Sequence, residues 1–505
     1  MKRLALIVFL AFALVVPAAT GFAAADLTIA TDAPPKSMNP HAFSSDANLS
    51  YMSNFFDGLL QRKSPDGALV PALAVSWERV DGVTWKFQLR EGVTFHNGND
   101  FDSADVKFTF ERMKDPKYSK LLNIANSIAE IQTPDAYTVI FKTGKPVPWF
   151  AETMHQNFIV DKESSENRDD GDYNTRPIGT GAYKFVEWVK GSYVRMEANP
   201  EYWEGAPKYK NVDIRPITED STRFAALAGK QADIVNGVPI TMFERIQNMD
   251  HVELITRPAR RCIYMDIGNR PDTPFEDIRV RQAIAHAINE QEIIDRVMRG
   301  QATMAHQVPD RATVGYDPDI QRLPYDPEKA KKLLAEAGYP DGFEITIAGP
   351  NDRYVNDEKI CEAVAKYLAK IGLTVNLDVK PKSIFFDELS DYTHQFYLIG
   401  WFDGSFDFGR SAEKLLHTPD PEKGMGAYNG AIYSNPEIDA AIIASSSILD
   451  RAEREKALQE INRKSVADVA WIPLHYQQDL YAVVTGKDIQ FTPRSDRWIV
   501  VKEIQ

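Results

Sequence analysis

Hydrophobic residues alternate with polar ones in the stretch that ends at residue 89. The apolar positions are Trp85, Phe87 and Leu89. Alternation of this kind predicts a β-strand with one buried face. Asn97-Gly98 then predicts a turn, because both residue types tolerate positive φ.

The next apolar positions recur at helical spacing and are Val106, Phe110 and Met113. Asp102 is the expected N-cap of this helix, and Asp105, three residues later, completes a capping box near the positive helix end. Residues 85–113 are therefore predicted to form a strand, a turn and a helix.

Elsewhere in the first half, residues 131–142 are predicted to contain an extended run in which Tyr137, Val139 and Phe141 alternate, and strands are predicted at 26–30, 212–217 and 232–235. The helix between the last two is expected to start at a Ser221 cap and to end at Gly229. Residues 163–175 are acidic and without periodicity, and we interpret them as an exposed loop. Asp169, Asp170 and Asp172 lack the spacing of a calcium loop, so a solvated loop is favoured.

After Arg260 the pattern indicates alternating helices and strands. A helix is predicted over 277–289, and another begins at the cap Asp326 and ends at Gly338. Apolar positions near 345–347, a helix over 357–371 and a strand over 374–379 follow. This order is typical of βαβ units and predicts an α/β fold.

The N-terminus has the pattern of a secretory signal peptide over residues 1–25. Lys2-Arg3 precedes an apolar run over 4–16, and small residues occupy 23–25. No cysteine lies near the cleavage region, so we expect a soluble exported protein without a lipoprotein anchor, periplasmic in a Gram-negative bacterium. Removal of Lys2 and Arg3 would change the net charge from −14 to −16. This charge argues against nucleic acid as a partner and against a polybasic membrane-surface role.

Cys262 and Cys361 are the two cysteines of the chain. Export permits a disulfide between them, and the loop that it would close is long. The favoured alternative is that both are small buried hydrophobic residues.

Several motifs occur together in one order: Leu89-Arg90, Gly92-Val93, Phe95-His96-Asn97-Gly98, Ala104-Asp105-Val106 and Glu111-Arg112. This series resembles the signature of family 5 extracellular solute-binding proteins, the peptide/nickel-type receptors of ABC importers. Further blocks with the same resemblance are Phe56–Leu59, Pro71–Ala74, Ile178–Tyr183, Asn199–Trp203 and Tyr325–Gly338. By this resemblance, residues 51–60 belong to a helix, and His96 is structural.

The resemblance implies a two-lobed periplasmic binding protein of type II, cluster C, with an additional inserted subdomain. The implied lobe I comprises 26–60, 175–265 and 476–505. The inserted subdomain comprises 61–174, and lobe II comprises 266–475.

The implied function is capture of a solute, preferably a di- or oligopeptide, in the cleft between the lobes. The protein would act as a monomer and deliver its ligand to the membrane permease subunits of an ABC importer. An oligosaccharide, an opine-like compound or a metal chelate remains an alternative ligand.

A secreted hydrolase is the less favoured class. The chain contains no G-x-S-x-G, H-E-x-x-H or C-x-x-C motif, and its nine histidines form no close pair. We therefore expect no enzyme activity, no catalytic residues, no resident metal and no cofactor.

The loop after Gly400 is the candidate ligand site, because it follows an apolar strand and is rich in glycine and aromatic residues. By the resemblance, an aspartate here pairs with the α-ammonium of a peptide, and Asp407 is the first choice and Asp403 the second. Phe408-Gly409 departs from the common pattern at this place. A loop-capping role is the alternative for both aspartates.

Other candidate ligand contacts come from cationic and aromatic residues. Arginines that could meet an anionic end of a ligand are Arg353, Arg410, Arg260 and Arg261. Trp401 is expected to line the cleft, with core packing as its alternative. Tyr428 and Asn429, in the following loop, are expected to face the cleft.

Overall fold

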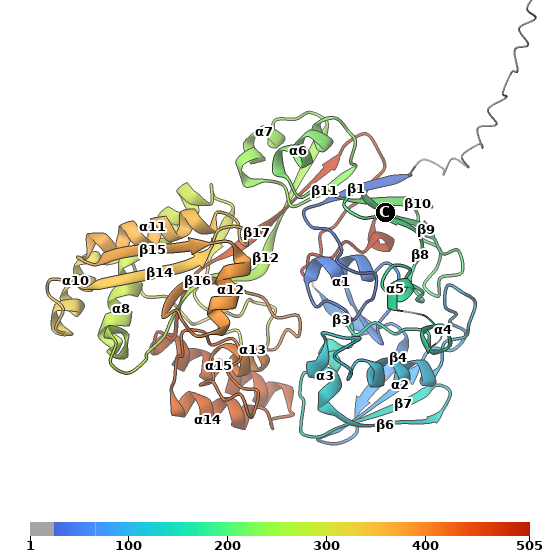
Figure 1. The fold of residues 1–505 in the computed structure, drawn as a ribbon, viewed down its shortest axis with the longest axis horizontal. Coiled ribbons are helices and arrows are strands. Elements are labelled where there is room, and N and C mark those ends of the chain that lie inside the picture. Colours follow the sequence, from blue (N-terminus) through green and yellow to red (C-terminus); the bar gives the residue numbers. More distant parts are fainter. Residues whose placement is uncertain (1–24, 66, 167, 169) are drawn as a thin grey trace, which may run out of the picture.

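The computed structural model describes residues 25–505 except 66, 167 and 169. Two lobes lie side by side, and a smaller α/β unit lies below one of them (Figure 1). The predicted two-lobed α/β fold is thus confirmed. The predicted signal peptide lies outside the described residues, apart from Ala25.

One sheet of eleven strands runs through both lobes, in the order β15-β14-β16-β12-β17-β11-β1-β10-β9-β8, with β13 paired to β17. The lobe I strands are β1 (Leu27–Thr31), β8 (Tyr183–Val189), β9 (Tyr193–Ala198), β10 (Asn211–Pro216) and β11 (Ile234–Asn236). The lobe II strands are β13 (Ala302–Met304), β14 (Glu344–Pro350), β15 (Thr374–Lys380) and β16 (Phe396–Trp401).

Two long strands, β12 (Val252–Ile267) and β17 (Trp471–Val484), connect the lobes as an antiparallel ribbon (Figure 1). The early part of β12 pairs with the end of β17 that also carries β11 of lobe I. The late part pairs with β16 of lobe II as well. The register shifts between Pro258 and Cys262, which marks where the ribbon passes from one lobe to the other.

Helices cover the lobe II sheet and form a group at the cleft side. These are α8 (Ile278–Ala287), α10 (Pro327–Glu336), α11 (Asp357–Lys370), α12 (Lys382–Ser390), α13 (Phe408–Leu415), α14 (Pro436–Ser445) and α15 (Arg451–Ala467). The predicted cap at Asp326 is confirmed, since its side chain accepts from the Lys329 backbone N–H at 2.9 Å. The helices predicted over 277–289 and 357–371 and the strand over 374–379 are also confirmed.

The smaller unit, which corresponds to the expected inserted subdomain, has a core of its own and two sheets, a two-stranded one of β2-β3 and a four-stranded one in the order β4-β5-β7-β6. Its strands are β2 (Leu60–Lys63), β3 (Ala68–Pro71), β4 (Ala74–Arg79), β5 (Thr84–Leu89), β6 (Ile128–Asp135) and β7 (Thr138–Thr143). Its helices are α2 (Ser103–Arg112), α3 (Leu122–Ser127), α4 (Lys162–Glu166) and α5 (Asp170–Tyr173). The extended run predicted within 131–142 is confirmed, since its alternating residues Val139 and Phe141 lie on β7, which pairs with β6 as a hairpin.

The strand, turn and helix predicted over 85–113 are confirmed. The Asp102–Asp105 capping box is formed at the start of α2. Val106, Phe110 and Met113 are completely buried. His96 is structural: its Nε2 donates to the Gly181 carbonyl at 2.9 Å, and burial lowers its pKa to about 4.

The remaining helical segments are short: α1 (Asp46–Met52), α6 (Asp220–Ala228), α7 (Phe243–Gln247), α9 (Glu290–Glu292), η1 (Ala151–Thr153), η2 (Ile240–Met242), η3 (Pro274–Glu276), η4 (Ile293–Val297) and η5 (Val501–Glu503). The helix predicted over 51–60 is wrong, because α1 ends at Met52. Asp57 turns away to accept hydrogen bonds from Thr180, Tyr202 and Trp203. A Cβ on Gly58 would lie 2.3 Å from the Met154 carbonyl, so this residue must be glycine.

Two further local predictions are wrong. Glu219, not Ser221, caps α6, because the Glu219 carboxylate accepts both the Thr222 N–H and the Ser221 hydroxyl. The loop expected over 163–175 contains α4 and α5. It is anchored by Tyr173, whose ring is buried under the Arg112 guanidinium at 4.3 Å.

Both cysteines are free thiols in the interior. Cys262 and Cys361 are completely buried, as the favoured alternative predicted. Burial raises the pKa of each thiol. Neither is therefore a nucleophile at neutral pH.

Candidate ligand-binding cleft

A cavity of about 530 Å³ lies between the lobes. Lobe I and the inserted subdomain supply one wall, with Asp46, Leu49, His155, Gln156 and Trp498. Lobe II supplies the other, chiefly from the end of β16, the loop after it and α13. The loop that follows Gly400 therefore reaches the cleft, as predicted from its place after an apolar strand.

Aromatic side chains form the apolar part of both walls. The Trp401 ring lies 5.7 Å from the Tyr428 ring, and its indole N–H donates to the Ser411 hydroxyl at 2.9 Å. On the opposite wall, Trp498 packs against His155 with ring centres 5.6 Å apart. Burial, reinforced by the charge of Arg62, lowers the pKa of His155 to about 3. The imidazole is neutral at physiological pH and adds no charge to the cleft.

Two of the cleft carboxylates are each held by several hydrogen bonds, including those of a paired arginine. Asp403 accepts from the backbone and hydroxyl of Ser405 at 2.7 and 2.6 Å and from Arg410 at 2.9 Å. Asp496 receives both Nε and Nη2 of Arg494, at 3.0 and 2.6 Å. Burial opposes ionisation of both carboxyls, but the paired arginines hold their pKa values below the usual one.

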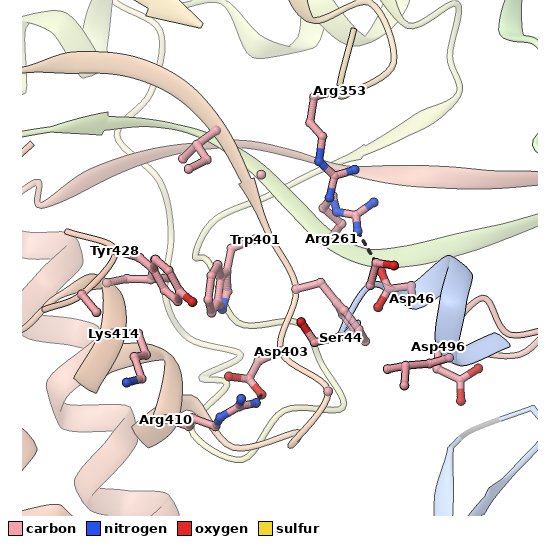
Figure 2. Close-up of a pocket in the computed structure, with 18 of the residues that line it drawn as sticks. Ser44, Asp46, Arg261, Arg353, Trp401, Asp403, Arg410, Lys414, Tyr428 and Asp496 are labelled. Atoms are coloured by element: carbon pink, nitrogen blue, oxygen red, sulfur yellow. Dashed lines mark hydrogen bonds and ion pairs between the residues drawn. The ribbon is translucent and has the colours of Figure 1, made fainter. Parts of the chain in front are cut away.

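The third cleft carboxylate, Asp46, lies at the first turn of α1. Its Oδ2 pairs with Arg261 on β12 at 3.2 Å, and the side chain is 33% exposed. Figure 2 shows this pair bridging the two sides of the cleft beside Arg353. Through this pair, the lobe I helix α1 contacts the connecting ribbon.

Two cleft cations have no carboxylate partner among residues 25–505 that the structure describes. The Arg353 guanidinium contacts the Tyr354 ring at 5.3 Å. Lys414, on α13, donates to the Gly424 carbonyl at 3.3 Å. Burial and the nearby charge of Arg410 lower the pKa of Lys414, with Glu413 opposing them.

Asp407, the first choice from the sequence, does not reach the cleft surface. Its carboxylate pairs with Arg454 at 2.7 and 2.8 Å and caps α13 through the Gly409 N–H at 2.8 Å. It is 4% exposed. A Cβ on Gly409 would lie 2.2 Å from the Arg454 Nη2, so the Phe408-Gly409 sequence makes room for this arginine. The geometry of Asp407 is that of the capping alternative.

The other predicted residues divide between the cleft and the core. The cleft wall contains Asp403, Trp401, Arg410, Tyr428, Arg353 and Arg261. Asn429 is completely buried and bonds to the backbone of His417 and Tyr433. Arg260 is buried and pairs with Asp310 at 2.8 Å.

Several cleft residues escaped the sequence reasoning. Asp46, Lys414 and Trp498 come from segments far apart in sequence, and only the fold brings them together. The Ser44-Ser45-Asp46 run does carry a helix-start signal, but this signal says nothing about a ligand.

One group of metal-ligand type occurs among the described residues, outside the cleft wall: Asp378, Glu388 and His394. The Lys380 ammonium lies 2.8 Å from Asp378 and 2.7 Å from Glu388, so a protein cation already occupies the space between the carboxylates. This cluster is an ion-pair network.

Among the described residues, no helix combines the length and the apolar character that a membrane span requires.

Comparisons with known proteins agree with this architecture. The sequence profile of bacterial extracellular solute-binding proteins, family 5 Middle, matches residues 68–422. A glutathione-binding protein of Pectobacterium atrosepticum is 27% identical over 467 residues, covering 89% of this chain and 88% of the relative.

Two solved structures extend the likeness over nearly the whole chain. The substrate-binding protein CtaP of Listeria monocytogenes superimposes with a TM-score of 0.85 at 25% identity, covering 95% of this chain and 98% of that one. The periplasmic binding protein DppA of Helicobacter pylori, in complex with the peptide STSA, has a TM-score of 0.79 at 25% identity, covering 95% and 97%. Proteins of this kind are periplasmic binding components of ABC importers. The chain belongs to family 5 of the bacterial extracellular solute-binding proteins.

Proposed function

We propose that the protein is an exported receptor that captures a short peptide or peptide-like solute and delivers it to the permease of an ABC importer. The observation that carries the proposal is the interlobe cavity of about 530 Å³, walled by both lobes. This volume falls within the usual range of small-molecule sites. Two-lobed receptors close over a ligand by hinge motion.

The nature of the walls favours a peptide-like ligand. Rings of Trp401, Tyr428 and Trp498 provide apolar surfaces, and charged groups stand between them. The relatives named above bind glutathione and a peptide, which are compounds of this mixed character. We propose Asp403, Arg410, Trp401, Tyr428 and Arg353 as ligand-contacting residues.

The test is a thermal-shift panel on the purified mature protein. Its arms are dipeptides, oligopeptides, glutathione, oligosaccharides, opines and nickel chelates. A ligand that binds only the native state raises the unfolding midpoint. A rise with peptides or glutathione, without chemical change of the compound, supports the proposal. A rise confined to uncharged sugars, or turnover of the peptide, contradicts it.

Delivery and oligomeric state form the second part of the proposal. We propose that the protein acts as a monomer, because its cleft is completed within one chain. Size-exclusion chromatography with light scattering tests this, with and without ligand. A dimer that dissociates only when ligand binds would contradict it.

A further inference from the structure

We infer that the cleft selects solutes carrying at least two carboxylates and does not require a free amino group on them. The inference rests on the proposed function of solute capture and specifies its ligand class. It follows from how the charged groups of the cleft are already engaged inside the protein.

The cleft offers little to a ligand ammonium. Such a group needs a carboxylate with unused lone pairs at the cavity surface. Asp403 is 7% exposed and already bound by Ser405, Ser411 and Arg410. Asp496 is 4% exposed and held by a two-pronged contact with Arg494. To bind either carboxylate, an ammonium would have to displace the paired arginine from an aspartate whose side chain is 4% exposed. Separating an ion pair at such a poorly solvated carboxylate is costly.

Asp46 is the most exposed of the three cleft carboxylates, and it is paired with Arg261. The Arg261 guanidinium is 11% exposed and lies 3.2 Å from the Asp46 Oδ2. A cation that approached Asp46 would therefore also approach Arg261. Since Arg353 lies beside this pair, the local field at that end of the cleft favours an anion (Figure 2).

Cationic groups, in contrast, are available at two separate places. Figure 2 shows Arg353 with Arg261 at one end of the cleft, and Arg410 with Lys414 at the other. Trp401 lies between these ends and presents a flat apolar surface. A ligand with a carboxylate at each end and an apolar or amide middle matches this order of groups.

The net charge of the whole chain is opposite in sign to the excess charge of the cleft wall. The sequence carries a net charge of −14, yet the cleft wall holds four cationic side chains and three carboxylates. The negative charge of the whole chain repels anions at long range, whereas the excess of cationic side chains in the cleft attracts them at short range, because a concave site focuses the field. Recruitment of the ligand should therefore weaken as salt screens these charges.

The experiment is isothermal titration calorimetry on the mature full-length protein with four dipeptide probes. These are Glu-Glu, N-acetyl-Glu-Glu, Ala-Ala and Lys-Lys. We expect Glu-Glu and N-acetyl-Glu-Glu to bind with similar affinity, and Ala-Ala and Lys-Lys to bind at least about tenfold more weakly. Raising the salt concentration should weaken binding of the two acidic probes.

Substitutions of single residues test which cleft side chains bind the acidic probes. Arg353→Gln and Lys414→Gln should each weaken binding of N-acetyl-Glu-Glu about 10- to 100-fold, the loss expected for one charge-assisted contact. Arg296→Gln and Lys332→Gln remove the same charges from exposed helical positions outside the cleft wall, where the side chains are 79% and 75% exposed, and should leave binding unchanged. Asp46→Asn frees Arg261 and should strengthen binding of the acidic probes.

The outcomes separate the inference from the function on which it rests. If acetylation abolishes binding, if Ala-Ala or Lys-Lys binds as well as Glu-Glu, or if Asp46→Asn abolishes binding, the inference is overturned while the receptor function stands. A different result would contradict both. If none of the four dipeptides binds, and no peptide and no glutathione raises the unfolding midpoint in the thermal-shift panel, both the peptide-receptor function and the inference are wrong.

Discussion

The guanidinium carbon of Arg62 lies 3.7 Å from the centre of the Phe406 ring. Arg62 belongs to β2 of the inserted subdomain, and Phe406 belongs to the lobe II loop that carries Asp403. A second guanidinium, that of Arg260, lies 3.3 Å from the centre of the same ring. Phe406 is therefore held between two cations, each of which is attracted to the electron-rich ring, and the contact joins the two sides of the cleft.

Phe406 also has a left-handed backbone, with φ of 59°. A side chain with a Cβ costs about 1 kcal/mol or more in this region, whereas glycine adopts it freely. We expect Phe406→Gly to be more stable than Phe406→Ala by about 1 kcal/mol, because both lose the ring and only glycine relieves the backbone. Urea unfolding of the two variants measures the difference. An alanine variant that is equally or more stable would show that the loop relaxes out of this conformation.

The Asp407–Arg454 pair gives a prediction about stability rather than binding. Both side chains are at most 6% exposed, and the pair makes two short contacts. Asp407→Asn should lower the free energy of unfolding by about 3–5 kcal/mol, because it leaves a buried guanidinium without its counter-charge. Ligand affinity of the folded fraction should be unchanged. Asp391→Asn, an exposed position with the same change of charge, is the control. If Asp407→Asn lost ligand affinity but kept its full free energy of unfolding, Asp407 would be a ligand-binding residue after all.

The two thiols should be unreactive in the folded protein. Cys262 and Cys361 are completely buried, and burial raises the pKa of both. We expect no reaction with a disulfide reagent such as DTNB under native conditions, and reaction of two thiols per chain after denaturation without reductant. Fewer than two reactive thiols in the denatured, unreduced protein would reveal an oxidised pair.

Asp266 gives a pH prediction with a definite sign. Its side chain is buried, it accepts the Tyr397 hydroxyl at 2.8 Å, and burial raises its pKa to about 7. The unfolded chain loses this proton near pH 4, so between about pH 4 and 7 the folded state holds a proton that the unfolded state has lost. The contribution of Asp266 to stability therefore falls as the pH rises through this window.

The variant Asp266→Asn removes that titration and keeps a hydrogen-bond acceptor for Tyr397. Its free energy of unfolding should rise relative to wild type on going from pH 5 to pH 8, with each unit of pKa shift worth about 1.4 kcal/mol. Chemical unfolding at several pH values measures this. Asp341→Asn, at an exposed position, should show no such trend. A constant difference between Asp266→Asn and wild type would mean that Asp266 is ionised throughout.

Local sequence signals identified two helix starts, although the equally local cap of α6 by Glu219 was missed. The Asp102–Asp105 box and the Asp326 cap involve residues within three positions of each other, and both were predicted correctly. The helix expected at residues 51–60 failed because Asp57 is bound by Thr180, Tyr202 and Trp203, more than a hundred positions away. The sequence pattern of residues 51–60 carries no information about partners so far away in the chain.

In the ligand site, too, the features set by nearby residues could be predicted and those set by distant residues could not. The loop after Gly400 could be identified from its strand and its composition, and it does reach the cleft. The roles of its two aspartates could not be assigned, because they depend on which arginine each one meets. Asp403 meets Arg410, seven residues away, and Asp407 meets Arg454, on a helix forty-seven residues away.

The ribbon of β12 and β17 makes the chain indivisible. Each of these strands begins in one lobe and ends in the other, so no cut in the sequence releases a lobe with complete strands. A fragment ending between Pro258 and Cys262 would keep a half-strand with unpaired backbone groups, which is a template for association with other chains. New ligand preferences must therefore arise by changes in the cleft loops and helices, while the ribbon that carries both lobes stays whole.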